Sequence, residues 1–384
     1  MAGIYIHIPF CSQFCTYCDF YSVKNREKKG LFIDALKIEL ERRAPDIIKR
    51  GESIETIYFG GGTPSQLSSD ALGEILDTIY RLYIEDFPVK RTGKIEPEIT
   101  IEVNPDDMTL QFAQQILGKG FNRLSIGVQS FNNEHLDFMN RRHNAEQAVL
   151  AFKNAREAGF KNISIDLIFG FEALTRKIWL EALKKAIDLN PEHISAYQLS
   201  VEPGTTLHKL IEKGKYNHPA DSESLEQYLL LQRVLKGAGY IQYEISSFAM
   251  DGAISKHNSN YWNFTPYYGF GPSAHSFDGV RRYWNCSSLA RYLTEVAKES
   301  RCKREELLTP VNKFNEYIML SLRQTKGIEV QMLNDISSFG VPDEFFKALS
   351  RHLKLGNLVE KRGYIKIPPK KFFFSDGIIR DLFI

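Results

Sequence analysis

Residues 4–18 read I-Y-I-H-I-P-F-C-S-Q-F-C-T-Y-C, a short apolar run followed at once by Cys11, Cys15 and Cys18. The β-branched run predicts a buried strand, so the cysteines fall on the loop that follows it. Closely spaced thiolates suit a soft metal, and three of them can hold three corners of a cubane iron–sulfur cluster while the fourth iron stays open. The stretch therefore predicts a cluster-bearing loop at a strand end.

Two alternatives would use the same cysteines, namely a structural zinc site and a disulfide. A tetrahedral structural zinc takes four ligands, and only His7 lies close enough in the sequence to supply the fourth. The spacing favours the cluster, and both alternatives stay open at the level of the sequence.

Length and composition allow one large folded unit and a smaller one, because the chain has 384 residues of which 43% are hydrophobic. A formal net charge of +2 gives no global basic field, so we expect no nucleic-acid partner. Nothing resembles a signal peptide or a membrane span. Cluster thiolates also need a reducing compartment, and we predict a cytoplasmic protein.

The first half of the chain alternates short β-branched runs with amphipathic helical stretches. Six strands are predicted, at residues 4–8, 55–59, 98–103, 123–128, 162–168 and 193–199. Helices are predicted between them, at residues 31–48, 69–82, 110–117, 145–158 and 176–189. This order is typical of an α/β fold with a parallel sheet, and it predicts a partial, open (β/α)6 barrel.

Unusual residues recur where the predicted strands end. They are Gly61, Gly62 and Thr63 after the second strand, Glu102 in the third, Gln129 after the fourth and Asp166 in the fifth. Active sites of barrels gather at the carboxyl ends of their strands. Glycines allow close backbone approach to a small ligand, carboxylates and amides accept from hydroxyls, and the fork of Arg141 suits a carboxylate. Each residue alone could be a turn, a cap or a solvated charge; together they indicate a ligand clamp.

The spacing Cys-x3-Cys-x2-Cys with an aromatic before the last cysteine, Tyr17, resembles the radical S-adenosylmethionine (SAM) superfamily, in which SAM chelates the open iron. The motifs H-I-P-F-C-S-Q-F-C-T-Y-C-D-F, G-G-G-T-P, E-V-N-P, G-V-Q-S and D-L-I-F-G occur in the order found in the oxygen-independent coproporphyrinogen III oxidase family. The resemblance implies a [4Fe–4S] cluster on the three cysteines. It also implies SAM contacts by Tyr5, Gly61, Gly62, Thr63, Glu102, Gln129, Arg141 and Asp166.

Two departures point to a subfamily. The decarboxylating enzymes carry a further cysteine two residues after the third and an N-terminal segment ahead of the cluster, whereas this chain has Phe20 and a cluster that begins at Cys11. The chain resembles instead the HemW branch, the heme chaperones, which share the pattern H-N-x-x-Y-W. That resemblance implies a protein that binds heme and passes it to respiratory hemoproteins. A true oxidase, and a module that binds nucleic acid, are the alternatives.

The pattern H-N-x-x-Y-W begins at His257 and includes Tyr261 and Trp262. A neutral imidazole can ligate heme iron, and flat aromatic side chains can contact a porphyrin. The alternative is an aromatic segment packed on the barrel, with His257 satisfied by a hydrogen bond. His275, a little further along, is a second candidate ligand.

Three units are therefore expected: a barrel at residues 1–245, a connecting region at 246–304 that carries H-N-x-x-Y-W, and a small, mostly helical C-terminal domain at 305–384. The last unit reads as helices followed by a two-stranded wing, and it resembles the winged-helix-like domain of the same family. The expected partners are heme and acceptor hemoproteins. Peripheral membrane association through an acceptor, and a homodimer, are open at this stage.

Overall fold

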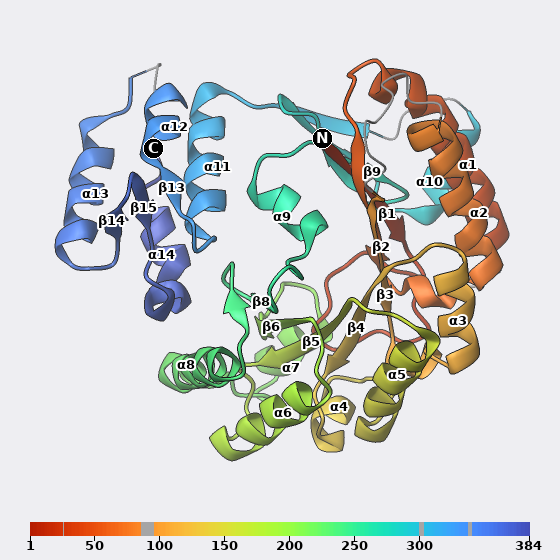
Figure 1. The fold of residues 1–384 in the computed structure, drawn as a ribbon, viewed down its shortest axis with the longest axis horizontal. Coiled ribbons are helices and arrows are strands. Elements are labelled where there is room, and N and C mark those ends of the chain that lie inside the picture. The colour runs from red at the N-terminus through yellow and green to blue at the C-terminus, as the bar shows by residue number, and fades with distance from the viewer. Residues whose placement is uncertain (26, 86–95, 299–302, 337–339) are drawn as a thin grey trace.

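The computed structural model describes residues 1–384 except 26, 86–95, 299–302 and 337–339 (Figure 1). Within the described ranges, a sheet of twelve strands has the order β12-β11-β10-β9-β1-β2-β3-β4-β5-β6-β8-β7. Neighbouring strands from β9 through β1 to β6 run parallel, and the strands at both ends of the sheet are antiparallel.

The six predicted strands are confirmed. They are β1 (Ala2–Ile8), β2 (Ile54–Gly61), β3 (Glu98–Val103), β4 (Arg123–Gln129), β5 (Ile163–Phe169) and β6 (His193–Gln198). Alternate side chains such as Ile4, Ile6 and Ile8 are fully buried under the helices. The opposite face is partly polar, because Thr56, Thr100 and other polar side chains lie buried there.

Helices cover the outer, convex face of this sheet (Figure 1). They are α1 (Lys29–Ile48), α2 (Ser69–Tyr80), α3 (Leu110–Gly118), α5 (Ala145–Ala158), α6 (Arg176–Asp188) and α8 (Asp221–Gly237). The short helices α4 (Asn133–Phe138) and α7 (Thr206–Glu212) lie beside the loop after β1, where Thr16 donates to the Phe138 carbonyl at 3.2 Å and accepts from the Leu207 amide at 2.8 Å. Short helical turns η1 (Pro64–Gln66), η2 (Arg81–Glu85) and η3 (Pro105–Asp107) follow β2, α2 and β3. Side-chain caps begin many of these helices; Asn144 and Gln147, for example, form a capping box on α5.

Residues 246–304, expected to connect two units, contribute strands to the large sheet. These strands are β8 (Ser247–Ala249), β9 (Tyr267–Phe270), β10 (His275–Phe277) and β11 (Arg281–Asn285), with β7 (Ile241–Gln242) before them and β12 (Lys303–Leu307) after them. Two helices, α9 (Lys256–Trp262) and α10 (Leu289–Ala297), belong to the same stretch. The barrel is therefore extended at both edges, which short strands did not reveal in the sequence.

Helix α9 lies on the concave side of the sheet, facing the C-terminal unit (Figure 1). That unit has the order helix, strand, helix, helix, strand, strand, as expected for a winged helix. Its elements are α11 (Pro310–Leu322), β13 (Ile328–Glu329), α12 (Val330–Ile336), α13 (Asp343–Lys354), β14 (Val359–Lys361) and β15 (Tyr364–Lys366), followed by η4 (Pro369–Phe374) and α14 (Ser375–Arg380). The second sheet has the order β13-β15-β14.

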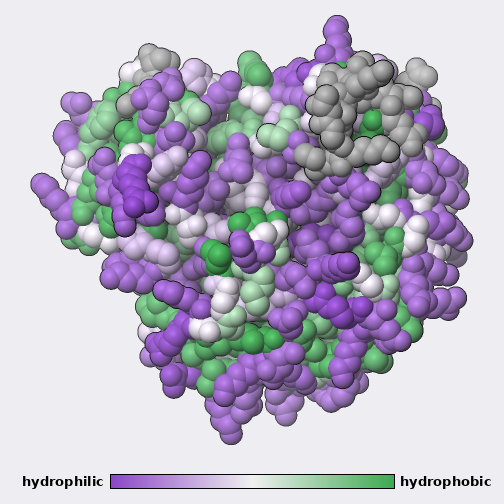
Figure 2. Space-filling model, in the orientation of Figure 1, coloured by the Kyte–Doolittle hydropathy of each residue, from purple (hydrophilic) through white to green (hydrophobic). Residues whose placement is uncertain are grey.

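Hydrophilic side chains dominate the face seen in Figure 2, and the apolar ones form small patches between them. None of the helices in the described ranges combines the length and the apolar character that crossing a bilayer requires.

Candidate functional site

The cysteine loop, residues 9–23, leaves the carboxyl end of β1 and returns beside its own start. The Cys11 amide donates to the Val23 carbonyl at 3.0 Å, and the Val23 amide donates to the Pro9 carbonyl at 2.7 Å. Cys11 and Cys15 are partly exposed, Cys18 is exposed, and all three are free thiols. Partial burial holds the pKa of the Cys11 thiol above its usual value, so binding of iron there would release a proton.

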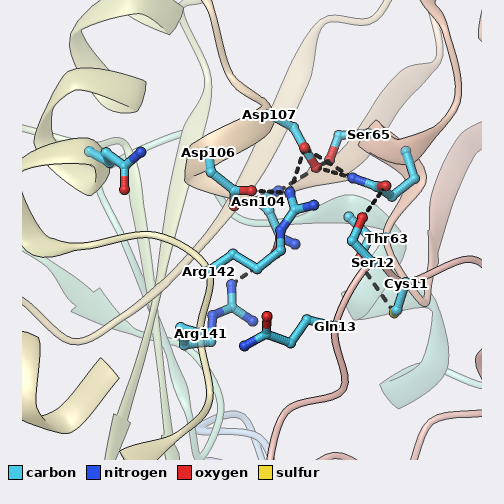
Figure 3. Close-up of polar contacts among 12 residues, drawn as sticks. Cys11, Ser12, Gln13, Thr63, Ser65, Asn104, Asp106, Asp107, Arg141 and Arg142 are labelled. Atoms are coloured by element: carbon cyan, nitrogen blue, oxygen red, sulfur yellow. Dashed lines mark hydrogen bonds and ion pairs between the residues drawn. The ribbon is translucent and has the colours of Figure 1, made fainter. Parts of the chain in front are cut away.

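A polar network braces this loop against the loops that follow β2 and β3 (Figure 3). Ser12 bonds to Gln66, whose amide nitrogen donates to Asp107 at 2.8 Å and 3.0 Å. Asp107 also accepts from Ser65 at 2.8 Å and from Arg142 at 2.6 Å. These residues were not predicted from the sequence, although the acidic pair after E-V-N-P and the Arg pair after α4 could have indicated them.

Arg141 lies at the centre of the same region, with its guanidinium directed to the cysteine loop (Figure 3). It donates to the Cys15 sulfur at 3.3 Å, to the side-chain oxygen of Asn104 at 2.8 Å and to the Gly127 carbonyl at 2.8 Å. Its Nε is buried and has no partner among the described residues. The predicted contact with a ligand carboxylate therefore has one unused donor available here, in addition to those that hold the loop.

The glycines of G-G-G-T-P pack against the chain itself. A Cβ built on Gly61 would lie 2.6 Å from the ring of His7, and one built on Gly62 would lie 2.8 Å from the Ile8 carbonyl oxygen. Thr63 Oγ1 is 3.4 Å from the Cys11 sulfur. Gly61 also has a φ of 105°, a conformation that favours glycine. A side chain at position 62 would disturb the cysteine loop directly. A substitution such as Gly62→Val would therefore change the loop as well as any ligand contact.

Glu102 on β3 and Asp166 on β5 lie on the concave face of the sheet. Tyr58 donates to Glu102 at 2.7 Å, and the Gly61 amide donates to it at 3.2 Å. Burial raises the pKa of Glu102 to about 7, and the charge of Asp166 adds to the shift. Asp166 accepts from Ser125 at 2.9 Å, while its second carboxylate oxygen is buried without a partner in the described part of the chain. An unused buried acceptor fits a ligand that donates from hydroxyls.

Gln129 and Tyr5 complete the predicted clamp. The register between β4 and β5 shifts just before Gln129, whose φ of 64° is unusual for a residue other than glycine. Such a bulge re-aims a side chain at a sheet edge. Tyr5 stacks on Tyr58 with ring centroids 6.1 Å apart and bonds to His7 Nδ1 at 3.2 Å. Gly61, Gly62, Thr63, Gln129 and Arg141 lie at or after the carboxyl ends of β2 and β4, whereas Tyr5 and Asp166 lie in the middle of β1 and β5. SAM contact by these residues stays a prediction.

His7 has both imidazole nitrogens engaged, because its Nε2 is 2.9 Å from the Tyr21 carbonyl. It therefore offers no free fourth ligand for a zinc ion. No group of three or more His, Cys, Asp or Glu side chains in the described ranges is arranged around a single metal position. A cubane cluster makes a different demand, because each thiolate binds its own iron atom.

His257 is buried on α9, with 1% of its surface exposed. Its Nδ1 is 2.8 Å from Thr56 Oγ1, and its Nε2 is 3.1 Å from the hydroxyl of Tyr261. Burial lowers the pKa of His257 to about 3, helped by the positive charge of Arg123. Ligation of heme iron would require one of these two hydrogen bonds to break. The geometry fits the alternative in which the imidazole is satisfied within a packed aromatic segment.

The other two residues of the motif face neighbouring elements as well. The ring of Tyr261 meets that of Tyr267 edge-on at 4.7 Å. The Trp262 carbonyl accepts from Gln324 at 3.1 Å, which ties α9 to the C-terminal unit. The indole nitrogen of Trp262 is buried and has no partner among the described residues. Among the described contacts, this nitrogen is the one polar atom on the aromatic side chains of the motif that has no hydrogen-bond partner.

Comparison with known proteins agrees with this architecture. The family model described as the radical SAM superfamily matches residues 5–186. The structure of coproporphyrinogen III oxidase from Escherichia coli, a radical SAM enzyme, superimposes with a TM-score of 0.82 at 24% identity, covering 99% of this chain and 89% of that one. At that identity the match shows the fold. Fold and site together define a radical SAM protein, a class that implies a [4Fe–4S] cluster and SAM.

Two curated relatives narrow the class. The heme chaperone HemW of Bacillus subtilis is 36% identical over 332 residues, which cover 85% of each chain. The mitochondrial radical S-adenosyl methionine domain-containing protein 1 of Danio rerio is 31% identical over 342 residues, 86% of this chain and 74% of its own. The chain belongs to the HemW family of heme chaperones.

Proposed function

We propose that this protein is a heme chaperone that carries a [4Fe–4S] cluster and SAM at the barrel mouth and passes heme to acceptor hemoproteins. The observation that carries the proposal is the 36% identity to a heme chaperone over 85% of both chains. The free thiols on the loop after β1 support the cluster, since three partly or fully exposed cysteines remain available to bind iron.

The residues around the loop fit SAM. When bound, a [4Fe–4S] cluster with an open iron supplies a position that SAM can chelate. Within the chain, Asp166 offers an unused buried carboxylate oxygen for a hydroxyl, and Arg141 offers an unused Nε for a carboxylate. Gln129 ends β4 at the register shift, and Glu102 in β3 accepts from the Gly61 amide at 3.2 Å. Cys11, Cys15 and Cys18 would hold the cluster.

The proposal is tested by heme titration of the full chain after anaerobic reconstitution with iron and sulfide, with and without SAM. We expect stoichiometric heme binding, and transfer of that heme to an apo-hemoprotein that recovers its own spectrum. Absence of heme binding in every condition would contradict the proposal. The alternative, an oxygen-independent coproporphyrinogen III oxidase, predicts conversion of coproporphyrinogen III in the same preparation, measured by product chromatography.

The cytoplasmic location, membrane association through a respiratory acceptor and a homodimer stay predictions. A nucleic-acid role for the C-terminal unit is not expected, because the chain's net charge is only +2.

A further inference from the structure

His275 differs from the other histidines in having an unoccupied imidazole. All nine histidines of the chain lie in the described ranges. Eight of them make a hydrogen bond or an ion pair through the ring, namely His7, His135, His143, His193, His208, His218, His257 and His352. In the described part of the chain, neither ring nitrogen of His275 has such a partner, and the residue is exposed. A metal can reach this imidazole without breaking any contact.

The position of His275 brings it to the edge of the sheet that carries the cysteine loop. It is the first residue of β10, which runs antiparallel to β9, and β9 runs parallel to β1. The amino end of β10 therefore lies at the same edge as the carboxyl end of β1. A close approach confirms this, because a Cβ on Gly271, in the turn before β10, would lie 2.5 Å from the His7 carbonyl oxygen.

Two further side chains continue from His275 in a row across the sheet. Trp284 on β11 is directly opposite His275, and Arg304 on β12 is directly opposite Trp284. Directly opposed residues of an antiparallel pair project from the same face. The imidazole and indole rings are stacked, with centroids 5.5 Å apart and an angle of 13° between their planes. Arg304 is exposed at the end of this row.

The row of His275, Trp284 and Arg304 lies on the concave side of the sheet. Arg282, two residues before Trp284 and so on the same face, pairs with Glu316 of α11 at 2.8 Å. Tyr283, on the opposite face, is 3.3 Å from Arg43 of α1. The face that carries His275 is thus the one turned to α9 and the C-terminal unit. Partial desolvation of the ring, which is exposed only in part, and the nearby charge of Arg282 lower the pKa of His275, which favours the neutral imidazole, the form that ligates metals.

We propose that His275 is the axial ligand of heme in this protein, with the edge of the Trp284 ring against the porphyrin and Arg304 pairing with a propionate. The inference rests on the proposed heme chaperone function and assigns its binding site. An imidazole, a flat aromatic side chain and a guanidinium in one row match the three chemical parts of heme, which are iron, ring and carboxylate. An exposed site also suits a protein that must release its cargo to another protein.

The test is a heme titration of His275→Ala in the reconstituted full chain, followed by absorption and electron paramagnetic resonance spectroscopy. We expect loss of the imidazole-ligated signature and a dissociation constant raised about tenfold or more, which equals about 1.4 kcal/mol. Added imidazole should restore the signature in His275→Gly. Trp284→Ala and Arg304→Ala should weaken binding several-fold while the axial signature remains.

His218→Ala is the matched control, because His218 is an exposed histidine outside the proposed site. It should bind heme as the unsubstituted protein does. If the unsubstituted protein binds heme and His275→Ala keeps both its affinity and its spectrum, the assignment is wrong and the chaperone function stands. If the unsubstituted protein binds no heme, the function itself fails. Unfolding midpoints and iron content of each variant verify that fold and cluster are intact.

Discussion

The cysteine loop and helix α9 both carry motifs made of potential ligands, yet the fold treats their side chains in opposite ways. On the loop, the backbone and neighbouring polar residues make most of the contacts that hold the segment. The three thiols form no disulfide and stay at least partly exposed, and weak contacts from Thr63 and Arg141 reach Cys11 and Cys15 within the described ranges. On α9, the motif side chains themselves make the contacts. His257 bonds to Thr56 and Tyr261 and is almost completely buried.

This contrast separates two reasons for a motif to exist. A segment whose functional groups are held open by other residues is prepared to bind something. A segment whose polar groups satisfy one another supports the structure, since buried polar groups require partners. By that criterion we expect the cysteine loop to be a ligand site and α9 to act as a brace between the barrel and the C-terminal unit.

The largest expected effect is the loss of the cluster from the cysteine loop. Cys11→Ala, Cys15→Ala or Cys18→Ala should each reduce bound iron and sulfide to background after anaerobic reconstitution, because two thiolates cannot retain a cubane that already has an open corner. Phe14→Ala, a change of an exposed non-ligand in the same loop, should retain the cluster. Full iron content in a cysteine variant, or stoichiometric zinc in the unsubstituted protein, would show that this loop is no cluster site.

The bracing role of α9 is tested by measuring the free energy of unfolding. His257→Ala should lower the free energy of unfolding by about 3 kcal/mol, because it removes buried hydrogen bonds and leaves a cavity. His275→Ala should cost about 1 kcal/mol or less, because that side chain is exposed. Denaturant titration measures both. A His257→Ala protein of unchanged stability whose heme spectrum loses the imidazole signature would reverse the assignment and make α9 the heme site.

The buried carboxyl group of Glu102 predicts how the stability of the protein depends on pH. Its pKa in the folded protein is about 7, against an ordinary value of 4.5, so the folded state holds the proton more tightly than the unfolded chain does. Stability from this group is complete below pH 4.5 and is lost as pH rises towards and through 7. The full loss is up to about 3 kcal/mol.

The measurement compares the free energy of unfolding of Glu102→Gln with that of the unsubstituted protein, by denaturant titration at several values between about pH 5 and 8. The variant should lose less stability across this range, because its amide does not ionise. Parallel curves for the two proteins would mean that Glu102 is already ionised in the folded state.

The smallest effect is expected at Phe20, which lies in the cysteine loop and is 65% exposed. Phe20→Cys should change the free energy of unfolding by no more than about 0.5 kcal/mol and should produce no decarboxylation of coproporphyrinogen III. One added thiol at an exposed position does not build a substrate site. Product chromatography gives the result, and measurable turnover by the unsubstituted protein would overturn the chaperone assignment.

Local patterns in the sequence were sufficient for much of the fold. The six parallel strands occur where β-branched runs predicted them, and α5 has the predicted bounds, Ala145–Ala158. Gln129 ends β4 as predicted, whereas Asp166, expected near a strand end, lies in the middle of β5. A shared ligand for Glu102, Gln129 and Asp166 stays a prediction. Strands β9 to β12 were missed, since short antiparallel strands carry too few residues for a clear period of two.

The sequence by itself determined the order of strands and helices, the cysteine loop and the family, because these depend on periodicity and spacing over short distances. Only the tertiary structure decided which motif side chains are free. His257 meets Thr56 from 201 residues away, and His275 remains open because it is exposed and no described residue hydrogen-bonds to its ring nitrogens. Burial and hydrogen-bond satisfaction arise from contacts between distant segments, and no local pattern encodes them.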